Sequence, residues 1–464
     1  MDLRDKKVTV VGLGKSGIES ALLAKRQGAV VSVTDNSDAE DIRKNAESLK
    51  EKYIAVEIGG HTERFLSRTE LLIVSPAVEK SSLPVRYAME RNIPIISEPE
   101  LGYLFCRGPI VAVTGTNGKS TVVSLLGEIL RQAGTRVNVC GNIGNPLSGE
   151  IKNIDEITEV ILETSSFQLE WIESFRPKIS VILNVTEDHL DRYRNFEDYL
   201  AAKKRIFKNQ AAGDVIILNY DDENLRTAVK PKKIPSKVLY FSARKKVDGI
   251  YLDKGNINIF LENKVKTLFG LGDLRLKGGH NIENILASVL VAILKGADII
   301  SVENTVKSFK PLPHRFERVR EIGGIEFIDD SKATNIDSTY QALKSLDRSV
   351  VLIAGGKDKN LSYEKILPAI KSNVKKIILI GETARKMRES FKSFVAVEEK
   401  NSLEEAVLAA YKSASPGDYV LLSPMCSSFD MFRDYKHRAE VFREAVNKLS
   451  PTGDEKQSAI PSLS

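Results

Sequence analysis

The chain has 464 residues, a length that at about 150 residues per domain predicts about three domains. Its 42% apolar and 28% charged residues are typical of a globular protein and exclude a disordered or fibrous chain. Its 68 Lys and Arg against 62 Asp and Glu leave only +6, which gives no sign of a nucleic-acid surface, and three widely spaced cysteines exclude a disulfide framework.

The chain alternates short apolar runs with amphipathic segments, a pattern that predicts α/β domains with mainly parallel sheets. In the first half we expect strands at 7–11, 30–34, 71–74, 110–113, 160–162 and 179–183, and helices at 17–27 and 199–208. Between 230 and 269 the pattern changes to short β-like pieces, with Gly249 and Gly255 as turns and Gly270 at the end. This change predicts an antiparallel insert or edge.

A helix is expected at 281–295, followed after Pro311-Leu312-Pro313 by a third alternating set with strands at 326–328, 349–353, 376–380 and 419–422. The most apolar helical stretch, 285–294, is much shorter than the roughly 20 residues that cross a bilayer. The sequence also shows no signal peptide, so we expect a cytoplasmic protein without membrane insertion. The predicted domains are 1–97, 98–312 and 313–449, with a mobile tail at 450–464.

The first motif is a GxGxxG turn, Gly12 to Gly17, between a strand and a helix, with Asp35 closing the next strand. Such glycines let a phosphate approach the helix N-terminus, and the acidic residue can bind sugar or base groups. Taken alone, the motif indicates a Rossmann domain for a nucleotide. The alternative is that the glycines only permit close packing of the strand and the helix.

The second motif, Thr114 to Thr121, reads TGTNGKST after the strand at 110–113. Backbone amides of such a loop cradle a triphosphate, Lys119 can neutralise it, and Ser120 or Thr121 can reach magnesium. The strict P-loop has a glycine where this chain has Val113, so the match is to a variant. An ATP site is the best-supported inference from a single motif.

Two polar groups follow predicted buried strands downstream of this loop. Glu163 follows the strand at 160–162, and His189 follows the strand at 179–183 and its extension. Because ligands bind at the carboxyl ends of parallel strands, a carboxylate and an imidazole there can hold magnesium. The alternative for His189 is a hydrogen-bonded loop histidine. His189, His280, His314 and His437 all lie in motif-like segments.

Three basic residues have two interpretations. By composition, Lys203, Arg315 and Lys332 belong to solvated basic surfaces. A cation beside Pro311-Leu312-Pro313, which we call the proline hinge, can instead stabilise a transferring phosphoryl group.

Taken together, the motifs in this order resemble the Mur ligase family over nearly the whole chain, up to about residue 447. The resemblance rests on these segments: 12–17, 114–121, 141–144, 163–168, 188–192, 202–203, 279–284, 314–317, 330–335 and 423–432. It implies a Rossmann-like N-terminal domain for a UDP substrate, a central P-loop-type ATPase domain and a Rossmann-like C-terminal domain for an amino acid.

The reaction that the resemblance implies is ATP-dependent addition of D-glutamate to UDP-N-acetylmuramoyl-L-alanine in peptidoglycan synthesis. ATP converts the alanine carboxylate to an acyl phosphate, and the D-glutamate amine then displaces phosphate to form the amide. The resemblance also implies Mg²⁺, with two sites, and a carbamoylated lysine at Lys203. We expect a monomer whose partners are these small molecules.

The resemblance assigns roles residue by residue. It places the ATP contacts at Gly115, Thr116, Asn117, Gly118, Lys119, Ser120, Thr121, Asn281, Asn284, Arg315 and Asp330, and the metal ligands at Ser120, Glu163, His189 and the carbamate of Lys203. It places the UDP-substrate contacts at Gly14, Lys15, Ser16, Gly17, Asp35, Asn36, Asn142 and His189, and the D-glutamate contacts at Thr334, Lys359, Ser428 and Phe429. The catalytic set is Lys119, His189, Lys203, Arg315 and Lys332.

Three positions depart from the family pattern or are ambiguous. Asn36-Ser37 stands where an arginine is familiar, and Ala77 replaces the glycine of Ser-Pro-Gly. Lys357 lies only two residues from Lys359 and competes for the same role. Other functions stay open: a sister ligase, a folylpolyglutamate synthase, a nicotinamide-dependent oxidoreductase suggested by the first motif alone, and a non-catalytic nucleotide-binding regulator.

Overall fold

The computed structural model describes residues 1–272, 279–359 and 362–450. The predicted tail at 450–464 therefore lies outside the described residues except for Ser450. By their contacts, the described residues form two compact units. Of the described residues, the first unit holds those up to Phe309 except Asp188–Asp191 and Gly279, and the second holds these five residues and the chain from Lys310 onward.

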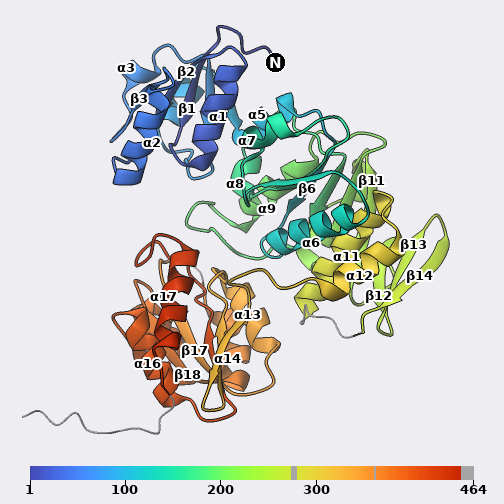
Figure 1. Ribbon diagram of the computed structural model, residues 1–464, viewed down its shortest axis with the longest axis vertical. Coiled ribbons are helices and arrows are strands. Elements are labelled where there is room, and N and C mark those ends of the chain that lie inside the picture. The colour runs from blue at the N-terminus through green and yellow to red at the C-terminus, as the bar shows by residue number, and fades with distance from the viewer. Residues whose placement is uncertain (273–278, 360–361, 451–464) are drawn as a thin grey trace, which may run out of the picture. The chain divides into compact units, whose positions relative to one another are not determined.

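The first unit begins with a five-stranded parallel sheet in the order β3-β2-β1-β4-β5 (Figure 1). Its strands are β1 (Lys7–Val11), β2 (Val30–Thr34), β3 (Ala55–Glu57), β4 (Leu71–Val74) and β5 (Ile95–Ser97). Its helices are α1 (Lys15–Arg26), α2 (Glu40–Lys50), α3 (Glu63–Leu66), α4 (Leu83–Glu90) and α5 (Glu98–Phe105). β4 is buried at every position, as expected for an internal strand of a parallel sheet.

The nine-stranded sheet of the same unit has the order β14-β13-β12-β11-β10-β9-β6-β8-β7. Its strands are β6 (Ile110–Thr114), β7 (Val137–Gly141), β8 (Glu159–Glu163), β9 (Ile179–Ile182), β10 (Val215–Asn219), β11 (Lys237–Ser242), β12 (Gly249–Asp253), β13 (Asn256–Leu261) and β14 (Lys264–Gly270). Its helices are α6 (Lys119–Gln132), α7 (Leu147–Glu150), α8 (Ser166–Leu169), α9 (Phe196–Lys204), α10 (Glu223–Ala228), α11 (Gly279–Leu294) and α12 (Ile299–Ser308), with 3₁₀ turns at Ile151–Asn153, Arg205–Phe207 and Pro231–Lys233.

The antiparallel edge predicted between 230 and 269 is present as β12, β13 and β14. The prediction that Gly249 forms a turn is wrong, because Gly249 is the first residue of β12 and pairs with Tyr240. A Cβ at Gly249 would lie 2.0 Å from the Tyr240 carbonyl oxygen, so the glycine permits close approach of two strands. Gly255 does form a turn, with φ of +78° between β12 and β13.

The second unit has a six-stranded sheet in the order β15-β16-β20-β17-β18-β19. Its strands are β15 (Glu317–Ile322), β16 (Ile325–Asp329), β17 (Val350–Gly355), β18 (Val374–Ile380), β19 (Ala396–Glu399) and β20 (Tyr419–Leu422). Its helices are α13 (Ile336–Lys344), α14 (Leu367–Asn373), α15 (Ala384–Phe391), α16 (Leu403–Ser413) and α17 (Tyr435–Asn447), with a 3₁₀ turn at Glu364–Ile366. β15 alone runs antiparallel to its neighbour.

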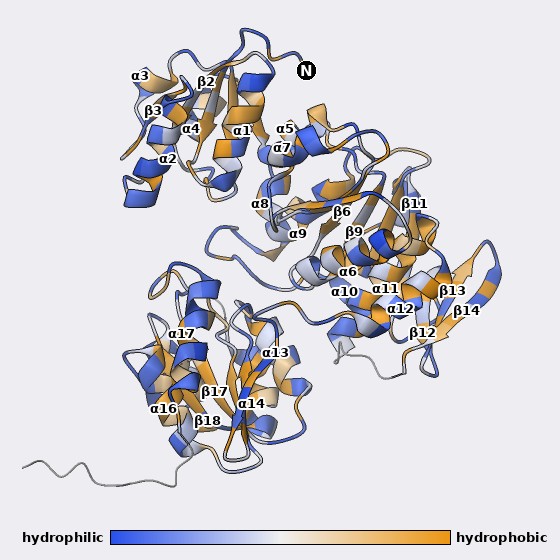
Figure 2. Ribbon diagram, viewed as in Figure 1, coloured by the Kyte–Doolittle hydropathy of each residue, from blue (hydrophilic) through white to orange (hydrophobic). Residues whose placement is uncertain are grey.

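Each sheet carries its own apolar core. Figure 2 shows the strands β17 and β18 as largely hydrophobic and the helices around them as mixed. The second unit has a separate cluster of buried apolar residues on each face of its sheet, and the first unit has its own clusters. No described helix has the length and hydropathy needed to span a membrane.

Candidate active site

A cleft lies at the carboxyl ends of the strands β1, β2 and β4 in the first unit. Its volume is about 790 Å³. The lining includes five residues predicted for the UDP substrate, Gly14, Lys15, Ser16, Asp35 and Asn36. It also includes His61 and the segment 75–79. This is the edge of a parallel sheet where ligands bind.

The glycines of the first motif have different tasks. Gly12 has φ of +104°, and a Cβ at Gly17 would lie 1.8 Å from the Gly12 carbonyl oxygen. Gly17 therefore serves the packing of α1 against β1, the alternative that the sequence left open. Gly14 has no heavy atom within 4 Å of a Cβ position and precedes α1 without a side-chain cap. The first-turn amides of α1 are thus available to an anion.

Asp35 organises the cleft through both carboxylate oxygens. Leu13 N donates to Oδ2 at 2.6 Å, and Ser37 N donates to Oδ1 at 2.8 Å. The carboxylate therefore ties the glycine turn to the turn that contains Asn36. Ala77 is not among the residues with positive φ, so alanine fits the backbone at this departure from the family pattern.

The second motif forms a loop between β6 and α6. Gly115 and Gly118 have φ of +157° and +86°, and Gly118 is the left-handed N-cap of α6. Asn117 N donates to Asn184 Oδ1 at 2.8 Å, which fixes the loop to the end of β9. The loop has the backbone geometry of a phosphate cradle.

Two ammonium groups meet at this loop. Lys119 Nζ donates to the Gly115 and Thr116 carbonyl oxygens, both at 2.8 Å, and Lys203 Nζ donates to Gly115 O at 2.9 Å. Lys203 is only 1% exposed and lies 4.5 Å from the Tyr199 ring centroid. The interpretation of Lys203 as a solvated basic residue is therefore wrong. Two cations on one carbonyl oxygen concentrate positive charge at the loop.

Glu163 ends β8 beside the strand that leads into the loop. It pairs with Val113 in the sheet, and its Oε1 accepts a hydrogen bond from Asn142 Nδ2 at 2.8 Å. Its buried Oε2 has no hydrogen-bond partner among the described residues. Its carboxylate and the hydroxyl of Ser120, a buried residue in the first turn of α6, are oxygen ligands of the kind that suits Mg²⁺.

The helix α11 contributes to the same loop. A Cβ at Gly118 would lie 2.2 Å from Asn284 Oδ1, so Asn284 packs directly against the loop. Asn284 Nδ2 donates to Asn281 Oδ1 at 3.2 Å. The structure thus brings together the predicted loop contacts and the asparagines predicted for the adenine side.

In the second unit, Asp188 is a buried carboxylate that contacts Lys359, which follows β17, and Asn335, which precedes α13. Lys359 Nζ lies 2.8 Å from Asp188 Oδ1, and Asn335 Nδ2 lies 3.2 Å from Oδ2. Burial alone would raise the pKa of Asp188, but the charges of Lys359 and His189 and these hydrogen bonds hold it well below its usual value. Lys357 is exposed, so the geometry favours Lys359 over Lys357 as the lysine of a binding site.

His189 follows Asp188 with φ of +57°, and its Nε2 lies 3.6 Å from Asp188 Oδ2. By its contacts His189 belongs to the second unit, whereas Ser120, Glu163 and Lys203 belong to the first. The grouping of these four as metal ligands, like the contact of His189 with the UDP substrate, stays a prediction.

Asp330 follows β16 and is 8% exposed. Burial raises its pKa to about 7, although hydrogen bonds from Ser423 Oγ and Phe316 N and the charge of Arg315 act the other way. Lys332 lies near the same turn, with its Nζ 3.7 Å from the Tyr435 ring centroid and its amide bonded to His314 O. The proline hinge and the turn after β16 thus hold Arg315, Asp330 and Lys332 in one region.

The residues predicted for D-glutamate lie on loops of the second unit. Thr334 N donates to Lys332 O at 2.9 Å, and Ser428 is 2% exposed. Phe429 is 69% exposed, so its side chain has no core role. Arg438, 1% exposed, donates to Ser331 O at 2.8 Å and to Cys426 O at 3.2 Å, and so connects the loops after β16 and β20.

Comparison with known proteins decides the family. A model of the Mur ligase MurD-like N-terminal domain matches residues 6–97, one of the Mur ligase middle domain matches 113–292, and one of the Mur ligase glutamate ligase domain matches 314–426. The chain belongs to the Mur ligase family.

Curated Mur ligases resemble the chain over almost its whole length. A protein of Geotalea daltonii named UDP-N-acetylmuramoylalanine–D-glutamate ligase is 41% identical over 97% of this chain and 99% of its own. Proteins of the same name from Thermoanaerobacter sp. and Acidobacterium capsulatum are 41% and 42% identical over 97% and 96% of this chain, and over 100% and 97% of their own.

Solved structures of Mur ligases share the fold. The MurC ligase of Thermotoga maritima has a TM-score of 0.58 and 19% identity, and covers 95% of this chain and 99% of its own. The MurF ligase of Thermotoga maritima, solved in complex with ADP, also has a TM-score of 0.58, with 18% identity and 96% coverage of both chains. These likenesses support the three-domain α/β fold.

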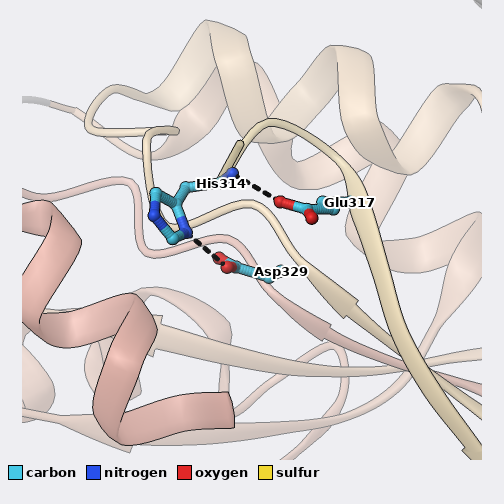
Figure 3. A group of neighbouring side chains, drawn as sticks. All are labelled: His314, Glu317 and Asp329. Carbon is cyan, nitrogen blue, oxygen red and sulfur yellow. Dashed lines mark hydrogen bonds and ion pairs between the residues drawn. The ribbon is translucent and has the colours of Figure 1, made fainter. Parts of the chain in front are cut away.

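In this Mur ligase, His314, Glu317 and Asp329 form a group with the ligand types of a metal site (Figure 3). His314 Nδ1 lies 2.8 Å from Asp329 Oδ2, and His314 N donates to Glu317 Oε2 at 2.9 Å. Arg443 ion-pairs with both carboxylates, at 3.1 Å from Asp329 and 2.5 Å from Glu317. Because Arg443 already supplies the cation, we assign this group to fixing the hinge beside Arg315.

Sequence motifs did not reveal several residues that shape the Mur ligase sites. Arg192 donates to the carbonyl oxygens of Pro76 and Val78 at 2.5 and 2.8 Å and so holds one wall of the cleft. It closes the segment 188–192, which was singled out for His189. Arg438, which is buried, and Arg443, which is part exposed, lie on α17 after the segment 423–432, where the sequence has no local signal for their distant partners.

Proposed function

We propose that this chain uses ATP to join D-glutamate to the alanine carboxylate of UDP-N-acetylmuramoyl-L-alanine, with release of ADP and phosphate. The observation that carries the proposal is the pair of anion sites in the first unit, within a chain about 41% identical to curated D-glutamate ligases. One site is the cleft at α1, and the other is the loop at α6. A nicotinamide oxidoreductase leaves the second site unexplained.

The proposed reaction balances in two steps. A carboxylate oxygen of the alanine attacks the γ-phosphorus of ATP, and the bond to ADP breaks. The D-glutamate nitrogen then attacks the carbonyl carbon, a proton leaves the nitrogen, and phosphate departs. Both steps bring anions together, so the enzyme must supply positive charge in a region without bulk water.

The loop residues bind and orient the triphosphate in this proposal. Lys119 exchanges its two loop carbonyls for phosphate oxygens, and the amides of the loop and of the first turn of α6 point to the anion. Glu163 and Ser120, with His189, hold Mg²⁺, which supplies electrostatic stabilisation of the transferring phosphoryl group. Oε2 of Glu163, for which the described part of the chain offers no hydrogen-bond partner, supports this role.

Lys203 is the proposed carbamate. Its Nζ is buried on the phosphate loop beside Lys119, where a second cation adds repulsion. Carbamoylation by CO₂ forms an N–C bond, releases two protons from the ammonium, and leaves an anion that can ligate Mg²⁺. We expect activity to fall when CO₂ is removed from the buffer and to return with bicarbonate, and Lys203→Arg to be inactive in both. Activity that is the same with and without CO₂ would contradict the proposed carbamate at Lys203.

In the second unit, Lys359, Thr334, Ser428 and the backbone near Phe429 bind D-glutamate, while Arg315, Lys332 and Asp330 contact the nucleotide. Lys359 is held by Asp188 in the structure, so a substrate carboxylate competes with Asp188 for this ammonium. The proposed enzyme acts as a monomer in the cytoplasm.

Oxygen tracing tests the chemistry. With ¹⁸O in the alanine carboxylate, one labelled oxygen is expected in each released phosphate, because that oxygen stays on phosphorus when the amide forms. Unlabelled phosphate accompanied by amide product would exclude the acyl phosphate route. ATP hydrolysis without amide product would reject the ligase itself.

A further inference from the structure

The backbone on both sides of Arg315 lies in the left-handed region. His314 has φ of +62° and Phe316 has φ of +50°, and neither residue is a glycine. Residues with a Cβ rarely adopt such angles, so the surrounding contacts must hold two of them this close together. Because Arg315 stands between the two, the direction of its side chain depends on those contacts.

Hydrogen bonds to the main chain hold this turn on both sides of Arg315. His314 N donates to Glu317 Oε2 at 2.9 Å, and His314 O accepts from Lys332 N at 3.1 Å. Phe316 N donates to Asp330 Oδ1 at 3.1 Å. The turn is therefore fixed by the first residue of β15 and by the turn that follows β16.

Arg443 on α17 supports both contacts that His314 makes. Its Nη2 lies 2.5 Å from Glu317 Oε2, the same oxygen that accepts the His314 amide. Its Nε lies 3.1 Å from Asp329 Oδ2, the same oxygen that lies 2.8 Å from His314 Nδ1 (Figure 3). Asp329 is fully buried, so its charge needs this partner. One guanidinium thus braces the carboxylates that hold the amide and the ring of His314.

The helix that carries Arg443 is itself fixed to the same part of the unit. Arg438 donates to Ser331 O at 2.8 Å, and Ser331 Oγ donates to Tyr435 O at 2.8 Å. Phe442, the neighbour of Arg443, is fully buried in an apolar cluster of the sheet. α17 is therefore anchored to the core and to the turn after β16, and Arg443 reaches the Arg315 turn from a fixed base.

We propose that Arg443 is a positioning residue, which braces Glu317 and Asp329 and so holds the left-handed turn that directs Arg315 to the transferring phosphoryl group. This inference rests on the proposed function, because Arg315 contacts the nucleotide only in that proposal. A cation stabilises developing charge from the correct position, and a misplacement of about 1 Å can cost about 100-fold in rate. Arg443 lies outside all the segments on which the family resemblance rests.

A double-mutant cycle tests whether Arg443 acts through Arg315. Amide product is quantified by mass spectrometry for wild type, Arg443→Met, Arg315→Ala and the double variant, with ATP, Mg²⁺, bicarbonate, UDP-N-acetylmuramoyl-L-alanine and D-glutamate. Arg443→Met keeps the length of the side chain and removes its charge. Lys436→Ala, at an exposed residue of the same helix, is the matched control and is expected to keep full activity. Thermal melting reports whether each variant is folded.

We expect Arg443→Met to lower kcat about 10- to 100-fold, with the KM for the UDP substrate within about twofold of wild type. In the Arg315→Ala background, the same change is expected to lower the rate by less than about twofold, because the group it positions is already absent. Equal losses in both backgrounds would show that Arg443 acts independently of Arg315 and would overturn the proposal. An Arg443→Met variant as active as wild type would overturn it as well.

Arg443→Lys replaces Arg443→Met in the cycle if the latter does not fold. It keeps a cation beside the buried Asp329, but one ammonium cannot reproduce the two separate contacts of the guanidinium. A loss of rate that disappears in the Arg315→Ala background supports the proposal. An unchanged rate assigns Arg443 to folding alone and overturns it.

The wild-type reaction distinguishes failure of this inference from failure of the proposed function. If wild type forms the amide and the cycle shows no coupling between Arg443 and Arg315, the ligase stands and only the role of Arg443 is rejected. If wild type forms no amide, the proposed function is rejected, and the role of Arg443 falls with it.

Discussion

At the scale of single residues, the phosphate loop is defined by Lys119 and Lys203, which share the Gly115 carbonyl oxygen. Lys119 is part exposed and can turn to a triphosphate, whereas Lys203 is buried. Lys119→Ala is expected to lower ATP-dependent phosphate release by at least about 100-fold, the usual cost of removing a preorganised charge from a transition state. Lys152→Ala, at an exposed lysine of the same unit, is the matched control and should keep full activity. Equal activity of the two variants would contradict the assigned role.

Asp330 gives a prediction on stability. The ordinary pKa of an aspartate, which applies in the unfolded state, is about 3.8, and the pKa of Asp330 in the folded state is about 7, so between these pH values the folded state holds a proton that the unfolded state releases. The contribution of this neutral carboxyl is fully present below about pH 4 and is lost as pH rises towards 7, at about 1.4 kcal/mol per pH unit. Asp330→Asn lacks this dependence.

Urea unfolding of the ligand-free protein at pH 5.0 and pH 6.5 measures the effect. The variant should gain stability relative to wild type as pH rises. A difference between the two proteins that is the same at both pH values would contradict the raised pKa of Asp330.

The sequence could reveal the residues of the phosphate loop, because the eight residues that form this loop, Thr114 to Thr121, are consecutive in the chain. They could not reveal Arg192 or Arg438, because the partners Pro76 and Ser331 lie 116 and 107 positions away along the chain. Lys203 was read as solvated for the same reason: its acceptor lies 88 positions away on another element. His189, Arg315 and the D-glutamate contacts keep the roles that the family resemblance gave them as predictions.

At the scale of elements, α6 has a left-handed glycine beyond each end, and only Gly118, at its N-terminus, lies in the phosphate loop. Gly118 and Gly134 have similar φ values of +86° and +80°, but a Cβ meets Asn284 Oδ1 at 2.2 Å only at Gly118. Both Gly118→Ala and Gly134→Ala should destabilise the fold by about 1–2 kcal/mol through left-handed strain. Only Gly118→Ala should also weaken ATP binding, by tenfold or more, because Asn284 and the loop must move.

Equilibrium unfolding and ATP titration of the two variants test this prediction. Equal losses of ATP affinity would show that strain in α6, rather than the Asn284 contact, controls the loop.

The sequence predicted several buried strands closely, but it missed β10, an interior and mostly buried strand. The predictions for β1, β2, β4 and β20 match the structure residue for residue. Of these, β4 and β20 are buried at every position and read as uninterrupted apolar runs. The edge strands β3, β5, β7, β15 and β19 were not predicted either. Gly249 was taken for a turn because a glycine that permits close strand approach has the same local signal as a turn glycine.

At the scale of the whole molecule, the two units have separate cores, and the residues lining the cleft all belong to the first unit. Calorimetric melting of the full chain is therefore expected to show UDP raising the transition of the first unit. At 100 times its Kd the ligand contributes about 2.7 kcal/mol to that unit. The transition of the second unit should stay in place. An equal shift of both transitions would contradict independent units.

The domain boundaries at 97 and 312 stay predictions, since the N-terminal and central sheets fall in one unit by their contacts. Family membership is independent of that division, because the matched segments span all three sheets. The motifs were sufficient to identify the family, because ten short segments in a fixed order are far more specific than either glycine turn alone.

Phosphate release tests the central claim most directly. It is measured with ATP, Mg²⁺, bicarbonate and UDP-N-acetylmuramoyl-L-alanine, adding D-glutamate, L-glutamate, meso-diaminopimelate or L-lysine in turn. Sustained release with D-glutamate alone, lost in Lys119→Ala, is the predicted result. Release with another amino acid instead would keep a Mur ligase and change its substrate, and no release from the folded protein with any of the four would contradict the proposed function.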